Sequence, residues 1–551
     1  MAVVARVDPS GFEIRWDQTR AKRYLDEGFW TDSTLVDVAR AAVAEGPARV
    51  LLVEGTVELT RREAWDRALR LAKFFADRGL MPGDVIAFQL PNWIETAMIA
   101  LAARMSGLII NPIPPIYRDA ELAYILADCG AKLIFIPEIF RKHDHLATLT
   151  RLRDRLPALR DVIVVRGAGD LRWEDAIASA PIEEAVLPAV DPAAVMMIMY
   201  TSGTTGKPKG VMHIHHGFDH RVRAMGEAWN IGPDDVVFMP SPVSHITGAF
   251  WAFDMPWVRG SRSVLIDIWA ADDGIRCIED NRCTVSGGAT PFLQQLLDVT
   301  RERPGALSSL RLFFCGGTTV SPELIKRSSE AFPNCLFFRV YGSTEMTTAT
   351  LGIQDRSQAE LGAETDGVIA YPTEIRIVDP VSDADLPDGD EGEILARGPG
   401  LFVGYVHPTD NAENFTPDGF FRMGDLGRRI HGDYLVITGR KKDIIIRSGE
   451  NISPKEVEDL LYAHPSIAEV AIVAMPSATT GEKGCAFVIP RAGATLDLRE
   501  IGRFLDAAGL ARQKFPEYLE LVDDLPRVPS GKVKKDVLRL RARAIAEEFQ
   551  K

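Results

Sequence analysis

The densest group of chemistry-bearing residues is the run Tyr200-Thr-Ser-Gly-Thr-Thr-Gly-Lys-Pro-Lys-Gly210, which directly follows an apolar strand. Its glycines let the backbone approach a ligand closely. Its hydroxyls and two lysines suit a bound polyphosphate. The Walker pattern GxxxxGK[ST] does not fit, because Gly203 and Gly206 are too close together and Pro208 follows Lys207. We therefore predict a phosphate-binding loop that is not of the Walker type.

Two further motifs end predicted strands and add groups that could hold a nucleotide. Val340-Tyr-Gly-Ser-Thr-Glu345 places a hydroxyl beside a carboxylate, and Cys315-Gly-Gly-Thr318 would let the backbone approach a flat base. Alone, the Val340–Glu345 motif is a weak turn signal. At this distance after the phosphate loop it becomes a strong one. A nucleophilic role for Cys315 is disfavoured, because a cysteine on a buried strand is more often inert packing.

Together these motifs resemble those of the adenylate-forming superfamily, which includes acyl- and aryl-CoA synthetases, peptide-synthetase adenylation domains and firefly-type luciferases. The resemblance extends from about residue 50 to residue 540. It implies an α/β protein with a large N-terminal domain, built of α/β subdomains and a β-rich subdomain, and a small mobile C-terminal α/β domain. It also implies ATP, Mg²⁺ and CoA as cofactors.

By this resemblance, the phosphate loop binds the triphosphate and the second motif binds its metal. Thr344 contacts the α-phosphate and Glu345 holds Mg²⁺, an ion that keeps much of its hydration and needs few protein ligands. The loop residues expected to bind ATP are Thr201, Ser202, Gly203, Thr204, Thr205, Gly206 and Lys207.

The resemblance also assigns the base and the sugar of the nucleotide. Tyr341 stacks on adenine, and Arg440 reaches the ribose. Asp425 accepts both ribose hydroxyls; it ends Arg422-Met-Gly-Asp425, where the family has Arg-Thr-Gly-Asp, so the carboxylate is kept. The glycines expected at the nucleotide are Gly316, Gly317 and Gly342.

The segment Pro526–Lys532 resembles the final motif of the family, whose lysine enters the site during adenylation. Charge supports this role for Lys532. A substrate carboxylate and the α-phosphate repel each other, and one lysine that bridges both stabilises the transition state. Lys532, Glu345, Thr344 and His245 are the expected catalytic residues.

Two further segments are expected to serve a thiol. The motif Thr438–Ile452 resembles the family hinge, with Lys442 at the hinge position. Its residues Ser448, Gly449 and Glu450 would line the pantetheine tunnel. His245, in a segment that resembles the acyl-pocket gate, would pack at the same tunnel.

The implied reaction joins a carboxylic acid to CoA through an acyl-AMP, with release of AMP and pyrophosphate. Gly288-Ala-Thr-Pro-Phe-Leu resembles medium- or short-chain fatty acid and alicyclic CoA ligases, which we favour. Tyr24–Trp30 resembles dihydroxybenzoate-activating enzymes, so an aryl acid is the alternative. Loading of a separate carrier protein and a luciferase-type oxygenase also stay open, whereas mere nucleotide binding is disfavoured by Glu345 and Lys532.

Composition and charge limit the classes of partner that the protein could bind. The 551 residues carry a formal net charge of −14, which argues against a nucleic-acid-binding surface. Six scattered cysteines, no apolar leader and no membrane-span-length apolar stretch predict a cytoplasmic protein without an integral membrane segment. A metal site at His213–His216 is disfavoured, because no further ligand stands at a suitable spacing. The expected partners are the carboxylic acid and CoA, with a homodimer as an option.

The elements that must position these residues alternate between strands and helices. Short apolar runs such as 85–90, 133–136, 195–200 and 336–340 predict buried strands of parallel sheets. Crowded turns from about 364 to 440 predict a β-rich subdomain. We expect an N-terminal core over residues 1–440 and a C-terminal domain over 443–551, divided at Lys442. The aromatic residues Phe250, Trp251, Phe253 and Trp257, beside small residues, suggest an apolar pocket for the acid.

Overall fold

The computed structural model describes residues 4–202, 207–300, 303, 305–528 and 531–548. It confirms the predicted α/β architecture with one large and one small part. The predicted loop residues Gly203, Thr204, Thr205 and Gly206 lie outside the described residues, as does the side chain of Ser202.

The first large sheet has six strands, and its parallel interior supports the phosphate-loop strand β11. Its order is β10 (Asp161–Val165), β7 (Leu133–Pro137), β5 (Val85–Phe88), β6 (Ile109–Pro112), β11 (Val195–Ser202) and β12 (Pro208–Ile214). The strands are almost wholly apolar because helices cover them. These helices include α3 (Arg61–Asp77), α4 (Ile94–Met105), α5 (Asp119–Asp128), α6 (His145–Leu152), α7 (Trp173–Ile177) and α8 (His215–Ala228).

The second sheet has seven strands and carries the other nucleotide motifs at its strand ends. Its order is β17 (Leu336–Val340), β16 (Leu312–Gly316), β15 (Val285–Gly288), β13 (Val236–Met239), β14 (Arg262–Leu265), β3 (Val50–Glu54) and β4 (Val57–Thr60). All neighbours are parallel except the hairpin β3–β4. The helices of this part are α2 (Leu35–Glu45), α9 (Ile246–Ala249), α10 (Met255–Arg259), α11 (Ala271–Asp280), α12 (Thr290–Thr300), α13 (Pro322–Ala331) and α14 (Ala359–Glu364).

A four-stranded antiparallel sheet follows in the chain, as the crowded turns predicted. It consists of β18 (Glu374–Val378), β19 (Gly392–Arg397), β20 (Phe421–Ile430) and β21 (Tyr434–Arg440). The N-terminal hairpin β1 (Val4–Val7) and β2 (Glu13–Trp16), with α1 (Gln18–Asp26), lies next to it because the Arg15 N–H donates to the Val403 carbonyl at 2.7 Å.

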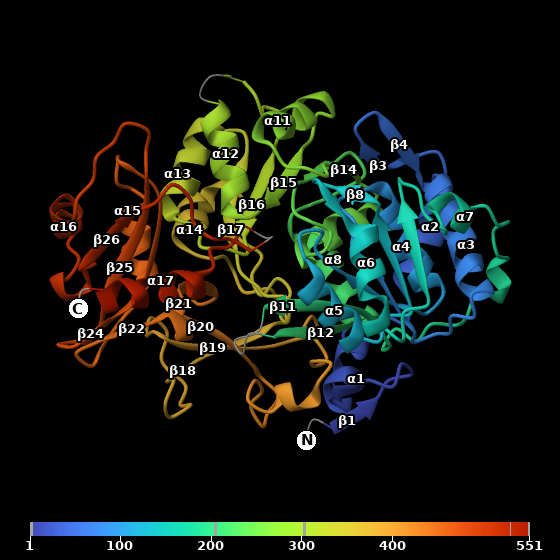
Figure 1. Cartoon of the computed structure of the whole chain (residues 1–551), viewed down its shortest axis with the longest axis horizontal. Coiled ribbons are helices and arrows are strands. Elements are labelled where there is room, and N and C mark those ends of the chain that lie inside the picture. The colour runs from blue at the N-terminus through green and yellow to red at the C-terminus, as the bar shows by residue number, and fades with distance from the viewer. Residues whose placement is uncertain (1–3, 203–206, 301–302, 304, 529–530, 549–551) are drawn as a thin grey trace.

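The C-terminal unit is built on its own five-stranded sheet and has its own apolar core. Its elements are β22 (Ile445–Arg447), β23 (Glu450–Ile452), α15 (Pro454–Leu461), β24 (Ile467–Ser477), β25 (Gly481–Pro490), α16 (Leu498–Ala507), β26 (Tyr518–Leu521) and α17 (Lys535–Glu548). In Figure 1 this unit, orange to red at the left, lies beside β16 and β17, whereas β3 and β4, dark blue at the other end of the second sheet, lie far from it at the right.

The structure defines the elements around the phosphate loop. His213 lies in β12, and α8 begins at His215. The loop joins two antiparallel strands, so Lys209 and Thr201 are paired strand residues. The predicted aromatic pocket needs correction. The aromatic side chains after His245 fill the core, and each is at most 4% exposed. No helix of the described residues is long and apolar enough to cross a membrane.

Candidate active site

The arms of the phosphate loop are anchored on both sides. The Tyr200 hydroxyl donates to Asp128 Oδ2 at 2.5 Å, at the end of α5. On the other arm, Lys209 Nζ lies 3.1 Å from Asp410 Oδ1 and 5.2 Å from the centre of the Tyr405 ring. The side chain of Lys207, by contrast, is exposed. The two strands that flank the predicted loop are therefore held in place, and Lys207 is the loop lysine that is free to bind an anion.

The adenine-site glycines lie where two adjacent strands end. Gly316 pairs with Val340 in the register of β16 and β17, so the two motifs leave the sheet side by side. A Cβ on Gly316 would lie 2.6 Å from the Val340 carbonyl, and one on Gly342 would lie 2.6 Å from the Thr348 nitrogen. Gly317 has a φ of +77° and open space around its Cα. Gly316 and Gly342 are thus required by the close packing of the chain itself, whereas the open space at Gly317 is where a flat group could approach the backbone.

Asp425 is the centre of a buried polar cluster. It is 5% exposed and accepts a hydrogen bond from the Tyr341 hydroxyl at 2.7 Å. Arg440 Nε lies 2.9 Å from its other oxygen, because Asp425 and Arg440 are opposite each other in β20 and β21. The Asp425 carboxylate raises the pKa of Arg440. Three residues predicted from separate motifs thus meet at one point.

Lys532 joins this cluster from the C-terminal unit. The positive charge of Arg440, then burial, lowers the pKa of the Lys532 ammonium to about 8, and Asp425 opposes that shift. The neighbouring Gly531 lies against the second sheet, because a Cβ on it would be 3.4 Å from Pro291 Cγ and 4.0 Å from Ala289 Cβ. The last motif of the chain therefore reaches the end of β15, in the large part of the molecule.

Glu345 has a partner that the sequence analysis missed. The Tyr405 hydroxyl donates to Glu345 Oε1 at 3.0 Å, and the Phe402 N–H donates to the Glu345 carbonyl. Tyr405 is 4% exposed. Next to Glu345, Thr344 lies by the buried His213: burial lowers the pKa of this histidine to about 4, and the Thr344 backbone opposes that shift. A carboxylate held at one oxygen still presents the other to a cation, and only the tertiary fold reveals Tyr405 as its support.

His245 stands at the start of an unusual helical segment. It is the N-cap of α9, which is followed by the π-helical turn Phe250–Asp254. Such turns often occur at functional sites. Burial lowers the pKa of His245 to about 4, so its ring is neutral near pH 7. Within the described part of the chain, its Nε2 and the Ser244 Oγ have no hydrogen-bond partner.

Asp254, at the end of the π-helical turn, is already paired with another side chain of the protein. It is fully buried, and its Oδ1 lies 2.6 Å from Arg104 Nη1 in an ion pair. A substrate ammonium would have to displace this guanidinium from a site without solvent, which is costly. Asp254 is therefore unsuited to bind an amino acid.

The hinge and tunnel candidates lie outside this cluster. Lys442 is exposed in the short 3₁₀ turn Lys441–Asp443 between β21 and β22. Ser448, Gly449 and Glu450 are exposed at the β22–β23 hairpin, where the Ser448 N–H donates to the Thr480 carbonyl. A role for these residues at the nucleotide is not visible in this arrangement.

The structure gives no support to a nucleophilic role for Cys315 or to a metal site at His213–His216. Burial raises the pKa of the Cys315 thiol to about 12, so it is a poor nucleophile. The described residues contain no group of three His, Cys, Asp or Glu side chains that could hold a metal.

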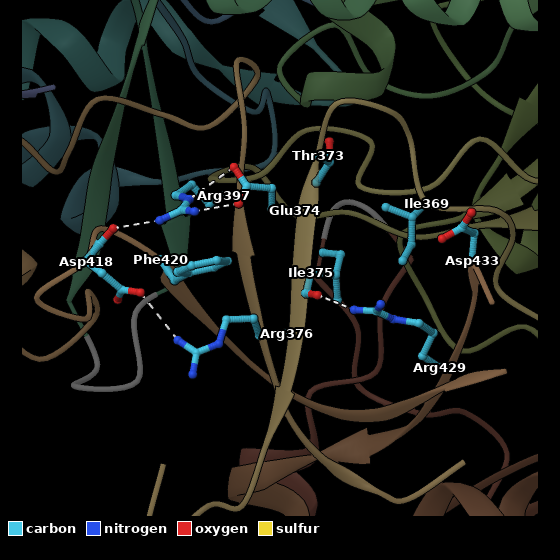
Figure 2. A pocket seen from close by; sticks show the side chains of 10 residues that line it. All are labelled: Ile369, Thr373, Glu374, Ile375, Arg376, Arg397, Asp418, Phe420, Arg429 and Asp433. Atoms are coloured by element: carbon cyan, nitrogen blue, oxygen red, sulfur yellow. Dashed lines mark hydrogen bonds and ion pairs between the residues drawn. The ribbon is translucent and has the colours of Figure 1, made fainter. Parts of the chain in front are cut away.

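A groove of about 650 Å³ opens elsewhere, on the β-rich sheet (Figure 2). It contains none of the predicted site residues. Its arginines are already paired: Arg397 with Glu374, Arg376 with Asp418, and Arg429 with the Ile375 carbonyl. These internal contacts leave none of the three arginines free to select an anion.

Comparison with known proteins is consistent with this site. A family model described as AMP-binding enzyme matches residues 39–406, and one described as AMP-binding enzyme C-terminal domain matches residues 456–532. The medium-chain fatty-acid–CoA ligase of Escherichia coli is 35% identical over 98% of this chain and 96% of its own. The 2,3-dihydroxybenzoate-AMP ligase of Bacillus subtilis is 29% identical over 97% of this chain and 98% of its own.

Among solved structures, the ATP-bound MatB of Rhodopseudomonas palustris superimposes with a TM-score of 0.83. It is 28% identical, and the match covers 93% of this chain and 99% of that one. The similarity spans both sheets of the large part and the C-terminal unit, so the whole architecture is shared.

Proposed function

The chain belongs to the AMP-binding enzyme family, and from this premise we propose that it is an AMP-forming acid–CoA ligase. In the first step a carboxylate oxygen attacks the α-phosphorus of ATP, and pyrophosphate leaves from an acyl-AMP. In the second step the CoA thiol attacks the acyl carbon, and AMP leaves. The observation that carries this proposal is the placement of the Lys532 segment: Gly531 lies against Pro291 and Ala289 of the large part, and the pKa of Lys532 responds to the charges of the paired Arg440 and Asp425.

Lys532 is the residue that would make the first step possible. Below pH 8 its ammonium is charged and lies close to the proposed ribose carboxylate Asp425. A carboxylate and an α-phosphate that approach each other concentrate negative charge. A half-buried ammonium between them stabilises that charge more strongly in the transition state than in the separated reactants.

The nucleotide would be held by the cluster around Asp425. Its two oxygens suit the two ribose hydroxyls, while Tyr341 and Arg440 fix its orientation. Gly316, Gly317 and Gly342 would face adenine. The triphosphate would meet Thr344, Lys207, Thr201 and the rest of the phosphate loop.

The groups around Glu345 fit Mg²⁺. A single protein carboxylate suffices for this ion when phosphate oxygens and water complete an octahedral shell. Bound there, the ion would neutralise charge on the leaving pyrophosphate. Tyr405 holds Glu345 in place, an arrangement in which an outer partner orients a metal ligand.

The second step would use residues that lie apart from the nucleotide cluster here. We propose that the C-terminal unit turns about Lys442, withdraws Lys532 and brings Ser448, Gly449 and Glu450 to a thiol tunnel beside His245. The boundary would then divide a core of residues 1–440 from a mobile domain of residues 443–551. The exposed turn Lys441–Asp443 is a suitable pivot, since hinges are short segments that absorb large changes in φ and ψ.

Replacing Lys442 with proline tests this rotation. Proline fixes φ and disfavours a helical backbone at the residue before it. We expect thioester formation to slow by about ten-fold or more, with a smaller loss in pyrophosphate exchange, because only the second step requires the new arrangement. Rapid-quench assays of each half-reaction would measure the ratio, and an unchanged rate of CoA transfer would argue against a pivot there.

For the acid, we propose a medium- or short-chain fatty or alicyclic carboxylate. The 35% identity to the Escherichia coli medium-chain ligase supports it, as does an Asp254 that is unable to bind an amino group. The second candidate is an aryl acid, joined to CoA or to a carrier protein. The near-complete match to the dihydroxybenzoate-AMP ligase supports that alternative.

One assay separates these reactions. Purified protein, MgATP and a panel of aliphatic, alicyclic and aryl acids would be followed for pyrophosphate release with and without CoA. We expect AMP, never ADP, and thioester only when CoA is present. Acylation of a supplied holo-carrier in the absence of CoA would favour carrier loading, and uptake of oxygen would indicate the luciferase class. Formation of ADP that depends on the acid would refute the proposal.

A further inference from the structure

Asn92 joins the two large sheets at a single turn. It lies in the loop between β5 and α4 and is 4% exposed. Its Nδ2 donates to the Ser241 carbonyl at 2.9 Å and to the Met239 carbonyl at 3.4 Å. Its Oδ1 accepts from the Val243 N–H at 2.8 Å. Both ends of one amide thus hold the turn that follows β13.

This turn leads directly into the gate segment. The His245 N–H donates to the Pro242 carbonyl at 3.0 Å. The turn also lies in close contact with Gly248, because a Cβ on Gly248 would lie 2.1 Å from the Pro242 carbonyl oxygen. The turn is therefore clamped between Asn92 and the first helical turn after His245.

The same turn borders the strand end that receives the Lys532 segment. A Cβ on Gly288 would lie 2.8 Å from Ser241 Oγ, and Gly288 is followed by Ala289 and Pro291, which pack against Gly531. A displacement of the turn would thus change the space in front of Gly288. It would also move the unpartnered His245 Nε2 and Ser244 Oγ.

We propose that Asn92 is a positioning residue that sets the shape of the acid pocket through the turn 239–245. This inference rests on the proposed function, since it names a determinant of the same site. The side-chain hydrogen bonds of Asn92 go to Met239, Ser241 and Val243, all in this turn and none in the nucleotide cluster. Its loss should therefore affect recognition of the acid and leave recognition of ATP intact.

The same loop supplies a matched control. Gln89 is 1% exposed and uses its amide in the same manner. It donates to the Pro114 and Tyr117 carbonyls at 3.2 and 3.0 Å and contacts His145 Nδ1 at 3.0 Å. Pro114 and Tyr117 lie in the loop between β6 and α5, and His145 begins α6, so none of these partners belongs to the turn 239–245. Gln89→Leu therefore removes a comparable set of buried hydrogen bonds without releasing the turn.

The test compares Asn92→Asp, Asn92→Leu and Gln89→Leu in the full chain. In Asn92→Asp the carboxylate faces two carbonyl oxygens, so the turn is repelled although the side-chain shape is kept. For both Asn92 variants we expect kcat/KM for the preferred acid to fall by about 10- to 100-fold and the ranking of acid chain lengths to change. The dissociation constant of ATP should stay within about two-fold.

Gln89→Leu should lower the melting temperature as much as Asn92→Leu but keep the wild-type ranking of acids. If Gln89→Leu and the Asn92 variants change the ranking equally, or if Asn92→Asp keeps it, the inference is wrong. Should Asn92→Leu not accumulate as folded protein, the isosteric Asn92→Asp decides the comparison. A wild-type protein that releases no pyrophosphate with any acid would instead refute the proposed function.

Discussion

Lys532→Ala is expected to reduce acid-dependent pyrophosphate exchange by about 10²- to 10³-fold, the loss seen when a donor to transition-state charge is removed. Thioester formation from supplied acyl-AMP and CoA should change by no more than a few-fold, because no carboxylate approaches a phosphate in that step. The two half-reactions would be measured separately, by isotope exchange and by quenched-flow chromatography of the thioester.

The exposed Lys534 provides a control for this substitution. It lies two positions from Lys532 on the same segment, and its backbone N–H bond to the Pro526 carbonyl survives a change of side chain. Lys534→Ala should leave both half-reactions near wild type. An equal loss of both half-reactions in Lys532→Ala would show that the residue is needed for folding or for both steps, against the proposed role.

Asp425→Asn is expected to raise KM for ATP by about 10- to 100-fold, the value of one or two hydrogen bonds to a charged group. It should also change the pH dependence. Lys532 has a pKa of about 8, so acid-dependent kcat/KM should fall as pH rises above 8 and the ammonium is lost. Asp425 is one of the groups that raise this pKa. Removing its charge should move the falling limb to lower pH.

Tyr341→Phe separates the two effects. It removes the hydrogen bond to Asp425 Oδ2 without changing any charge near Lys532. KM for ATP should rise, but the alkaline limb should stay where it is in the wild type. Profiles of kcat/KM against pH for the three proteins would measure this. An Asp425→Asn profile with an unmoved limb would show that the two groups are not coupled.

Much of the fold follows from local pattern. The capping box of Thr60 and Glu63, a local signal for a helix start, begins α3, and the Glu54–Gly55 turn closes the β3–β4 hairpin. Long apolar runs become buried strands at the predicted places. The sequence analysis missed the strand β12 (Pro208–Ile214). Its segment contains Lys209, Gly210 and His213, which indicated a loop that runs into a helix.

The sequence motifs pointed to Asp425, Arg440 and Lys532 from separate parts of the chain, and the structure brings them near one another. The site was not predictable where a residue acts through packing. Tyr405 supports Glu345 from a distant segment, and only the tertiary fold brings the two together. The aromatic residues from Phe250 onward gave the wrong indication, because apolar composition alone cannot tell a filled core from an open pocket. Their burial shows that they are core residues.

The cluster around Asp425 has a consequence for the order of events. Arg440 and then burial lower the pKa of Lys532, and burial and then Arg440 lower the pKa of Lys442, so positive charges lie near one another where the two parts of the molecule meet. Asp425 pairs with Arg440, and a triphosphate would supply further negative charge for the lysines. Because a ligand stabilises the arrangement it binds best, the nucleotide should hold the C-terminal unit in place. We therefore expect ATP to bind before the acid. High salt should weaken this preference for ordered binding, because it screens the charges.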